Sequence, residues 1–231
     1  MTPLFDPPVL PLLPIAGEGG MAYPVARIFC VGRNYAAHAA EMGNEVDREA
    51  PFYFTKSPFS VAASGATRPY PPGTKEYHHE MELVVAVGAP LFRAGRDAAR
   101  AGIWGYGCGL DMTRRDLQAA AKDKRRPWDV AKDVEGSAVL GPLTRMEGAE
   151  IGDRAIRLSV NGAVRQDARL SEMIHDVPAI LADLSRLYHL APGDLVMTGT
   201  PAGVGAVGPG DRLEGEVEGL APVTLTLGPA E

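Results

Sequence analysis

The stretch that decides the fold is EMELVVAV, residues 80–87, in which two glutamates lead into a run of branched apolar residues. Successive side chains of a β-strand point to opposite faces, so Met81 and Leu83 face one side while Glu80 and Glu82 face the other. The run is far shorter than the roughly 20 residues that a membrane helix needs. We expect a strand with one face in the core and two carboxylates together on the other face.

Short β-branched runs, bounded by Gly, Pro, Asn and Asp, continue on both sides of this strand in a chain of 231 residues with 27 Gly. This pattern predicts an α+β fold that is dominated by strands and has a few short helices. The expected strands cover residues 27–31, 80–87, 103–110, 195–198 and 223–227, with a hairpin turn at 160–163. The expected helices cover residues 35–42, 96–102, 114–124 and 178–188.

Two of these helices carry recognisable end signals. Asn34 is expected to cap the first helix and Gly43 to end it. Thr113 is expected to cap the helix that starts near residue 114, with Asp116 completing a pattern like a capping box. These signals predict where both helices begin.

Proline and glycine mark the segments outside these elements. Residues 1–24 hold six of the 20 prolines and show no periodicity, which predicts a proline-rich arm that packs on the body or on a second subunit. The catalytic domain is then expected over residues 25–231. Residues 44–78 are interpreted as a long connection and residues 199–210 as a tight glycine-rich loop.

The charge balance, the N-terminal residues and the cysteines limit which binding partners and which cellular compartment are expected. Lys and Arg number 23 against 29 Asp and Glu, so the formal charge is −6 and there is no electrostatic reason to bind nucleic acid or an anionic membrane. The first basic residue is Arg27, and prolines interrupt the preceding apolar residues, which is unlike a signal peptide. Cys30 and Cys108 lie in apolar segments, as buried reduced thiols do. We expect a cytoplasmic protein.

Asp111 decides whether the glutamate pair is interpreted as a solvated strand face or as part of a metal site. Glu80 and Glu82 alone are also compatible with a solvated strand face at a sheet edge. Asp111 stands where the apolar strand 103–110 ends, within reach of a pocket at that strand end. Three carboxylates brought together out of water require a compensating cation, and oxygen ligands favour Mg²⁺, Mn²⁺ or Ca²⁺. Ligation by His78 and His79 would shift the choice toward a transition metal, but histidines in such a flank are more often surface residues or hydrogen-bond partners than ligands.

His38 and Glu41 are spaced i, i+3 on the short helix 35–42, which places them on one helix face. A carboxylate beside an imidazole raises its basicity, and such a pair can accept and return a proton near neutral pH. A surface contact on the helix is the alternative.

Four further residues can handle an anionic ligand. Lys132 lies in an apolar stretch, where an ammonium can stabilise an oxyanion or an enolate, although many such lysines are surface residues. Arg115 and Gln118 can bind a carboxylate, with a solvent-facing pair as the alternative. Thr200 can offer its hydroxyl group. Residues 203–208 also match the pattern G-x-G-x-x-G of dinucleotide-binding sites. Pro and Gly follow it where such a site needs a helix, so we do not expect a dinucleotide site here.

Five blocks of sequence together resemble the fumarylacetoacetate hydrolase family, in matching order and spacing from about residue 27 to residue 227. They are VGRNYAAH (31–38), HEMEL (79–83), LDMTRRD (110–116), PWDVAK (127–132) and TGTPAGVG (198–205). The resemblance implies the mixed β-roll of that family's C-terminal domain and, usually, a homodimer.

The resemblance also implies a metal centre. It implies Mg²⁺ or Mn²⁺, with Ca²⁺ able to replace them in a crystal, held by Glu80, Glu82 and Asp111. It further implies that His38 and Glu41 form a water-activating dyad on a segment that closes over the substrate.

The resemblance places other residues around a keto acid. It implies that Lys132, Arg115, Gln118 and Thr200 surround the pyruvate end of the substrate, and Arg33, within the first block, is expected to bind substrate too.

The chain departs from the family at two places. It has KDVE at 132–135 where the family often has KSFD, and KS at 56–57 where the family often has KP. We expect the extra acidic groups to alter which acyl tail is accepted.

The activity implied is metal-dependent hydrolysis of a carbon–carbon bond in a 2,4-diketo acid. The chain is most similar to the family branch that converts fumarylpyruvate to fumarate and pyruvate in aromatic-acid (gentisate) degradation. His38, oriented by Glu41, is expected to deprotonate the attacking water, and Lys132 to stabilise the oxyanion or enolate. The alternatives are an oxaloacetate decarboxylase or another acylpyruvase. A non-catalytic metal-dependent keto-acid binding protein is the alternative from another class, which an intact dyad disfavours.

Overall fold

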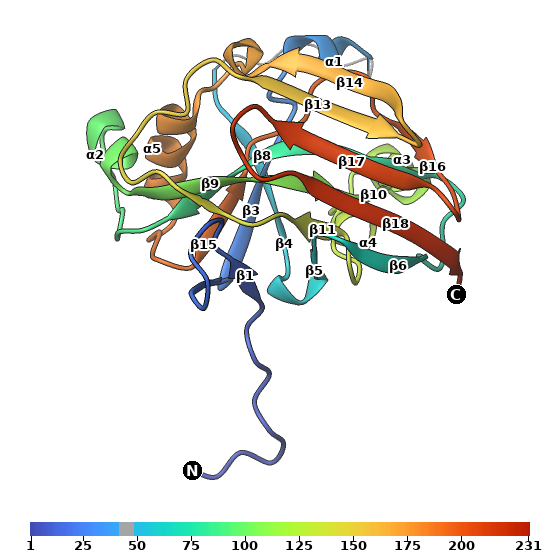
Figure 1. Ribbon diagram of the computed structural model, residues 1–231, viewed down its shortest axis with the longest axis horizontal. Coiled ribbons are helices and arrows are strands. Elements are labelled where there is room, and N and C mark those ends of the chain that lie inside the picture. The colour runs from blue at the N-terminus through green and yellow to red at the C-terminus, as the bar shows by residue number, and fades with distance from the viewer. Residues whose placement is uncertain (42–48) are drawn as a thin grey trace.

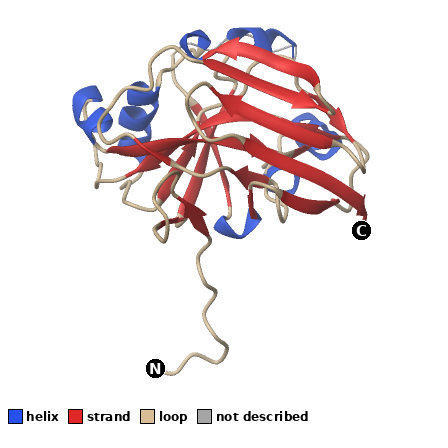
Figure 2. Ribbon diagram, viewed as in Figure 1, coloured by secondary structure: helices blue, strands red, loops and turns tan. Residues whose placement is uncertain are grey.

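Two β-sheets pack against each other and form the body of the protein, with short helices at its periphery (Figures 1 and 2). The computed structural model describes residues 1–41 and 49–231. The core between the sheets takes apolar side chains from both of them. The predicted β-dominated fold with few helices is confirmed.

The larger sheet has eight strands in the order β4-β3-β15-β8-β9-β11-β5, and β12 pairs with β9 beside this path. Its strands are β3 (Arg27–Gly32), β4 (Phe52–Lys56), β5 (Val61–Ala63), β8 (Met81–Val87), β9 (Ile103–Asp111), β11 (Ala138–Leu140), β12 (Thr144–Arg145) and β15 (Asp194–Met197). Strand β8 lies in the middle of the sheet and is buried along its whole length. Strand β4 lies at one edge.

The smaller sheet has five strands in the order β14-β13-β17-β18-β6. Its strands are β6 (Ala66–Tyr70), β13 (Ala155–Val160), β14 (Ala163–Arg169), β17 (Arg212–Val217) and β18 (Val223–Ala230). Buried and exposed residues alternate along β17, so one face of this sheet covers the core and the other faces solvent.

The remaining elements connect and cover the sheets. A three-stranded sheet contains β7 (Tyr77–His79), β10 (Thr113–Arg114) and β16 (Gly205–Val207), and a hairpin contains β1 (Leu12–Pro14) and β2 (Ala22–Pro24). The helices are α1 (Ala36–Glu41), α2 (Arg96–Ala101), α3 (Arg115–Asp123), α4 (Asp129–Lys132) and α5 (Val177–Leu187), with 3-10 turns η1 (Pro58–Ser60) and η2 (Leu170–Glu172). Within the described residues, none of these helices has the length and apolar character to cross a membrane.

The two faces of β8 meet two different cores. Leu83 belongs to the core between the sheets, whereas Val84 belongs to a second core that Leu13 and Tyr23 of the β1–β2 hairpin help to close. Glu82 shares the face of Val84 because side chains alternate along a strand. The face that carries the glutamates is therefore covered by protein, and Glu82 is only 2% exposed, unlike a residue on a solvated sheet edge.

Local patterns predicted several elements closely. Residues 160–163 form the expected hairpin turn, in which Asn161 and Gly162 have φ angles of 52° and 78° between the paired residues Val160 and Ala163. Positive φ at both central residues is what a tight hairpin turn requires. The helix expected over 178–188 is α5, which starts one residue earlier with the Asp176 carboxylate accepting a hydrogen bond from its first turn.

Two segments interpreted as connections contain strands, so those predictions were wrong. Residues 44–78 contain β4, β5, β6 and the start of β7, and residues 199–210 contain β16. The prolines misled the prediction because they lie between these short strands or, like Pro69, in an edge strand, where a missing N–H group is tolerated.

Both predicted side-chain caps were also wrong. Asn34 accepts a hydrogen bond from the His175 N–H and donates to the carbonyls of His175 and Thr198, so it ties three segments together. Thr113 lies in β10 and donates to the Asp111 carbonyl. Asn34 therefore has distant partners and Thr113 a neighbouring carbonyl in place of the helix end. Gly43, the predicted end of the first helix, lies outside the described residues.

The N-terminal arm is shorter than the 24 residues expected. The segment before β1 runs away from the body (Figure 1). Residues 12–24 instead form the β1–β2 hairpin, in which Leu13 and Tyr23 are buried. The hairpin is therefore part of the body, because it covers the second core.

Candidate active site

Three carboxylates meet where β8 begins and β9 ends. Glu80, Glu82 and Asp111 are all buried, and each offers an oxygen that lies within 4.8 Å of those of the other two. The antiparallel register explains this, since Met81 pairs with Leu110 and the Asp111 N–H donates to the Glu80 carbonyl at 2.8 Å. The three carboxylates predicted to meet are therefore brought together.

Three basic side chains surround the carboxylates. Lys132 donates hydrogen bonds of 2.7 Å to Glu80 Oε2 and 2.6 Å to Asp111 Oδ2. Arg115 donates to Glu80 Oε1, and Lys56 Nζ lies 2.9 Å from Asp111 Oδ1. Burial would raise the pKa of Glu80, but Lys132 and Arg115 hold that pKa below its usual value. Such pairing is what permits charges to be buried.

Glu82 differs from the other two carboxylates. Its Oε2 accepts a hydrogen bond from the Gly199 N–H at 2.8 Å, and no basic side chain in the described part of the chain pairs with it. Burial, followed by the charges of Asp111 and Glu80, raises the pKa of Glu82 well above its usual value. A divalent cation held by oxygen ligands would relieve this repulsion, so the donor set fits Mg²⁺ or Mn²⁺.

Lys56 is a buried residue of the site that the sequence analysis did not identify as a site residue. Its ammonium donates to Ser137 Oγ at 2.8 Å, to the Lys132 carbonyl, and at 3.3 Å to the carbonyls of Met112 and Ser137. Its local signal was weak, since it simply ends an aromatic strand, and all these partners lie 56 or more residues away in sequence.

The two departures from the family pattern contact each other. The Ser57 N–H donates to Asp133 Oδ1 at 2.8 Å. A proline at position 57 would have no N–H to donate, so serine here and aspartate at 133 form one structural link. Asp133 therefore joins the end of β4 to the end of α4.

His38 and Glu41 lie together on α1, as their spacing predicted. His38 Nδ1 is 3.4 Å from Glu41 Oε2, and the Gly203 N–H donates to both oxygens of Glu41 at 3.2 and 3.1 Å. Burial lowers the pKa of His38, against opposing contributions from Glu80 and Glu41. The imidazole is therefore neutral at pH 7 and able to accept a proton.

A narrow cavity of about 30 Å³ joins these groups. Its lining includes eight of the ten predicted site residues: Arg33, His38, Glu80, Glu82, Arg115, Gln118, Lys132 and Thr200. The other two predicted residues contact this lining: Asp111 accepts a hydrogen bond from Lys132, and Glu41 lies next to His38. Arg115 also donates to Gln118 Oε1, so these two side chains act as one unit.

Gln166 of β14 is a second buried residue that sequence reasoning missed. Its amide nitrogen donates to Thr200 Oγ1 at 2.7 Å and to the Pro201 carbonyl at 2.8 Å, and its oxygen accepts from the Met81 N–H at 3.0 Å. Since Thr200 Oγ1 accepts from Gln166, its own hydrogen is available to a ligand. Neighbouring residues of β14 are mostly exposed, so no local pattern marked Gln166.

The histidines before Glu80 lie outside the carboxylate cluster. His79 Nδ1 is 3.3 Å from Gln166 Oε1, and His78 Nε2 is 3.2 Å from Glu76 Oε2. The group of possible ligands found among the described residues contains neither histidine. They act as hydrogen-bond partners, as expected.

The sequence matches one family over most of its length. The pattern of the family described as fumarylacetoacetate (FAA) hydrolase C-terminal covers residues 27–227. The chain belongs to this family. The resemblance found in the five sequence blocks is therefore confirmed.

Individual relatives agree with this assignment. A fumarylpyruvate hydrolase from Ralstonia sp is 54% identical over 192 residues, which are 82% of this chain and 100% of that protein. An oxaloacetate tautomerase from Escherichia coli is 38% identical over 208 residues, 89% of this chain and 94% of that protein. The crystal structure of fumarylpyruvate hydrolase from Pseudomonas aeruginosa in complex with Mn²⁺ and pyruvate is 42% identical, with a TM-score of 0.92, and covers 99% of this chain and 100% of that chain.

Proposed function

We propose that this protein hydrolyses a carbon–carbon bond of a 2,4-diketo acid in a metal-dependent reaction, with fumarylpyruvate as substrate and fumarate and pyruvate as products. The observation that carries the proposal is the buried carboxylate cluster beside the His38–Glu41 pair. The relatives named fumarylpyruvate hydrolase support the choice of substrate. The degradation of aromatic acids is the metabolic setting that such a substrate implies.

Glu80, Glu82 and Asp111 are the residues that would hold Mg²⁺ or Mn²⁺. When bound, such a cation supplies Lewis-acid polarisation of the oxygens of a chelating keto acid. The complex of the Pseudomonas aeruginosa enzyme with Mn²⁺ and pyruvate supports both the metal and the pyruvate end of the substrate.

His38 is the proposed general base. Its neutral imidazole takes the proton of the water that attacks the carbonyl of the acyl group, and Glu41 stabilises the imidazolium that results. His38 then returns the proton to the carbon atom of the leaving pyruvate. Lys132 stays protonated, because Asp111 and Glu80 raise its pKa more than burial lowers it. Its ammonium is the proposed stabiliser of the oxyanion or enolate.

The pyruvate carboxylate is proposed to meet Arg115, Gln118 and Thr200. All three line the narrow cavity together with Glu80 and Glu82. A guanidinium and an amide provide N–H donors, and Gln166 leaves the hydroxyl hydrogen of Thr200 available. These donors suit a small anionic group held at the metal centre.

The test is the loss of ultraviolet absorbance of fumarylpyruvate with protein freed of metal by a chelator, before and after Mg²⁺ or Mn²⁺ is added. We expect rapid loss only with metal, and fumarate and pyruvate as products. Glu82→Gln removes a carboxylate of the cluster and should lower the metal-dependent activity. Glu216→Gln, which changes an exposed residue of β17, is the matched control and should keep it. No loss of fumarylpyruvate with either metal would overturn the choice of substrate.

The base is tested separately. His38→Ala should lower turnover about 10³-fold at saturating metal, within the range typical of general acid–base groups. Turnover close to that of the wild type would exclude His38 as the base.

Reactions of oxaloacetate are the second candidate, since the Escherichia coli relative is an oxaloacetate tautomerase. Decarboxylation of oxaloacetate needs no activated water, so Glu41→Gln should impair hydrolysis much more than decarboxylation. Conversion of oxaloacetate between its keto and enol forms can be followed in the same assays. Calorimetric binding of oxalate without turnover of any keto acid would instead indicate a binding protein.

We further propose a homodimer and a cytoplasmic setting. The family resemblance supports the dimer, and sedimentation at micromolar protein tests it. Cys30 and Cys108 are both free and buried, which suits a reducing compartment.

A further inference from the structure

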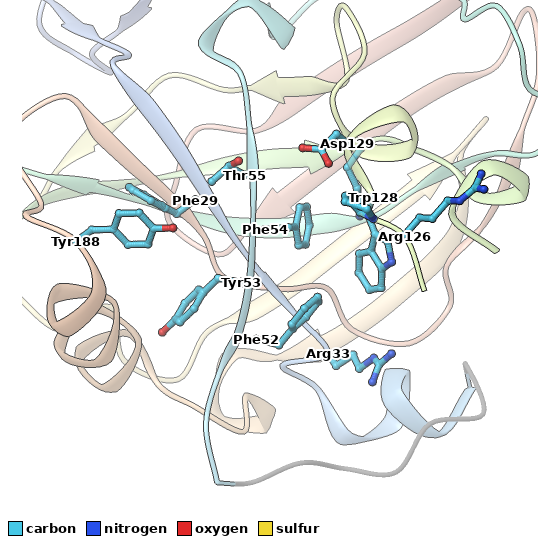
Figure 3. A pocket seen from close by; sticks show the side chains of 12 residues that line it. Phe29, Arg33, Phe52, Tyr53, Phe54, Thr55, Arg126, Trp128, Asp129 and Tyr188 are labelled. Carbon is cyan, nitrogen blue, oxygen red and sulfur yellow. The ribbon is translucent and has the colours of Figure 1, made fainter. Parts of the chain in front are cut away.

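A second, larger cavity adjoins the carboxylate site. It has a volume of about 480 Å³, and we call it the aromatic cavity (Figure 3). Arg33, Phe54, Trp128 and Lys132 line both this cavity and the narrow one. A ligand held at the carboxylates can therefore extend from one cavity into the other past these four side chains.

Three aromatic rings form a wall of the aromatic cavity. The rings of Phe52 and Trp128 are 5.0 Å apart and nearly perpendicular, and the Phe54 ring lies 6.0 Å from that of Trp128 (Figure 3). Phe52 is 44% exposed, although aromatic side chains are usually buried in a core. Flat apolar surfaces of this kind favour a flat, conjugated ligand.

Basic side chains line the route between the cavities. Lys122 lines the narrow cavity, Arg126 the aromatic cavity and Arg33 both. Lys122 Nζ lies 5.1 Å from the centre of the Trp128 ring. Burial, followed by the charge of Arg33, lowers the pKa of Lys122, so these two cations repel each other.

These cations differ from those of the carboxylate cluster in their partners. Across residues 1–41 and 49–231, the structure places no carboxylate within ion-pair distance of Arg33, Lys122 or Arg126. By contrast, Lys132 and Lys56 each pair with Asp111. Cations that repel each other beside an aromatic wall are stabilised by an anionic ligand.

We propose that the aromatic cavity is the subsite for the acyl tail, that it selects a flat unsaturated tail ending in a second carboxylate, and that Arg33 and Lys122 determine this specificity. This inference rests on the proposed function and adds the cavity and the residues that select the acyl tail. The diketo end lies at the carboxylates, and the unsaturated carbons lie against Phe54 and Trp128 where the two cavities meet. The distal carboxylate then meets Arg33, which lines both cavities, and Lys122, whose ammonium lies beside the Trp128 ring. An acetyl tail has no carboxylate there and gains nothing from them.

The test compares two diketo acids that differ in the tail. Arg33→Gln and Lys122→Gln should each lower kcat/KM for fumarylpyruvate about 10-fold or more, because each removes a charge-assisted hydrogen bond. The kcat/KM for acetylpyruvate should change less than about 3-fold, as expected for a substrate that lacks the second carboxylate. Equal losses on both substrates would overturn the proposal.

Two controls separate the tail subsite from a general effect of charge or folding. Lys124→Gln removes an exposed charge two residues from Lys122 and should leave both substrates unaffected. Arg33→Lys keeps the positive charge and should recover most of the selectivity for fumarylpyruvate. A loss of selectivity in Lys124→Gln as large as that in Lys122→Gln would contradict a specific site.

A binding measurement distinguishes failure of this inference from failure of the proposed function. Fumarate should quench the tryptophan fluorescence, to which Trp128 and Trp104 contribute, at concentrations at which crotonate, which has one carboxylate, does not. Arg33→Gln should abolish that difference. If the wild type cleaves neither diketo acid, the proposed function fails, and the fumarate preference still supports the subsite. If fumarate and crotonate bind alike, the subsite is wrong even if hydrolysis is observed.

Discussion

The carboxylate cluster and the aromatic cavity lie side by side but are built in opposite ways. In the cluster, Glu80 and Asp111 are buried and pair with basic side chains. In the cavity, Phe52 is 44% exposed and Arg33 has no carboxylate partner among the described residues. The cluster therefore has fixed charges in a dry setting, which suits a metal ion, whereas the cavity leaves its charges available to a ligand.

Strand β4 belongs to both regions. Its last residue, Lys56, is buried against Asp111, while Phe52 and Phe54 line the cavity. An edge strand permits this, because its neighbour β3 covers one side and the other side stays open. The position of a residue along one strand thus decides whether it supports the metal centre or the tail subsite.

The largest expected effect comes from removing a charge from the cluster. Glu82→Gln should lower kcat about 10⁴-fold, since Lewis-acid chemistry contributes several kcal/mol. In the wild type, Mn²⁺ at 100 times its Kd should stabilise the fold by about 2.7 kcal/mol and raise Tm by about 5–10 °C. The Tm of Glu82→Gln should respond much less to Mn²⁺. An equal shift of Tm in both proteins would show that the ion binds elsewhere.

The second effect is a pH dependence that originates at His38. Burial lowers the pKa of this imidazole, and the base must be neutral. The kcat/KM should therefore stay level as the pH falls through 6.5 and then decrease about tenfold per unit below the pKa in the folded protein. Glu41→Gln removes a contact that raises this pKa, so it should move the acidic limb to lower pH. An acidic limb above pH 6.5 would contradict the assignment.

A smaller effect is expected at the edge of the cluster, where Gln166 orients Thr200. Gln166→Leu should raise KM for the substrate about tenfold, because the hydroxyl of Thr200 is no longer held and buried hydrogen bonds are lost. Gln166→Glu keeps an acceptor for the Met81 N–H and serves as the conservative comparison. A fall in kcat with unchanged KM would indicate a role other than positioning a substrate-binding group.

The smallest effect is expected in the aromatic cavity. Phe52→Ala should lower the free energy of unfolding by about 1 kcal/mol, the range of one aromatic pair. Leu83→Ala, in the core between the sheets, should cost about 2–5 kcal/mol. Urea unfolding measures both. A loss at Phe52 as large as that at Leu83 would show that the cavity wall is part of the core.

Parts of the site could be predicted because their signals are local. Glu80 and Glu82 lie two apart on a strand, and His38 and Glu41 three apart on a helix, so each pair shares a face by geometry alone. Asp111 stood out because it ends an apolar strand. Lys56 had no such local signal, because its role depends on carbonyls contributed by segments far along the chain.

The elements of the fold also differ in whether a local sequence signal predicted them. The hairpin at 160–163 and helix α5 followed from turn residues and apolar spacing. The strands within residues 44–78 did not, because they are short, and each depends on a partner from elsewhere in the chain. The cap expected at Asn34 failed for the same reason, since His175 and Thr198 offered better partners.

The sequence by itself determined the β-dominated class, the family and the residue types of a metal centre with a general base, since these depend on spacings of two to four residues and on five ordered blocks. Only the tertiary structure decided that Lys56 and Gln166 support the site and that an aromatic cavity opens beside it. The physical reason is that strand pairing and side-chain burial join residues that are distant along the chain, and no local pattern records which distant residues will meet.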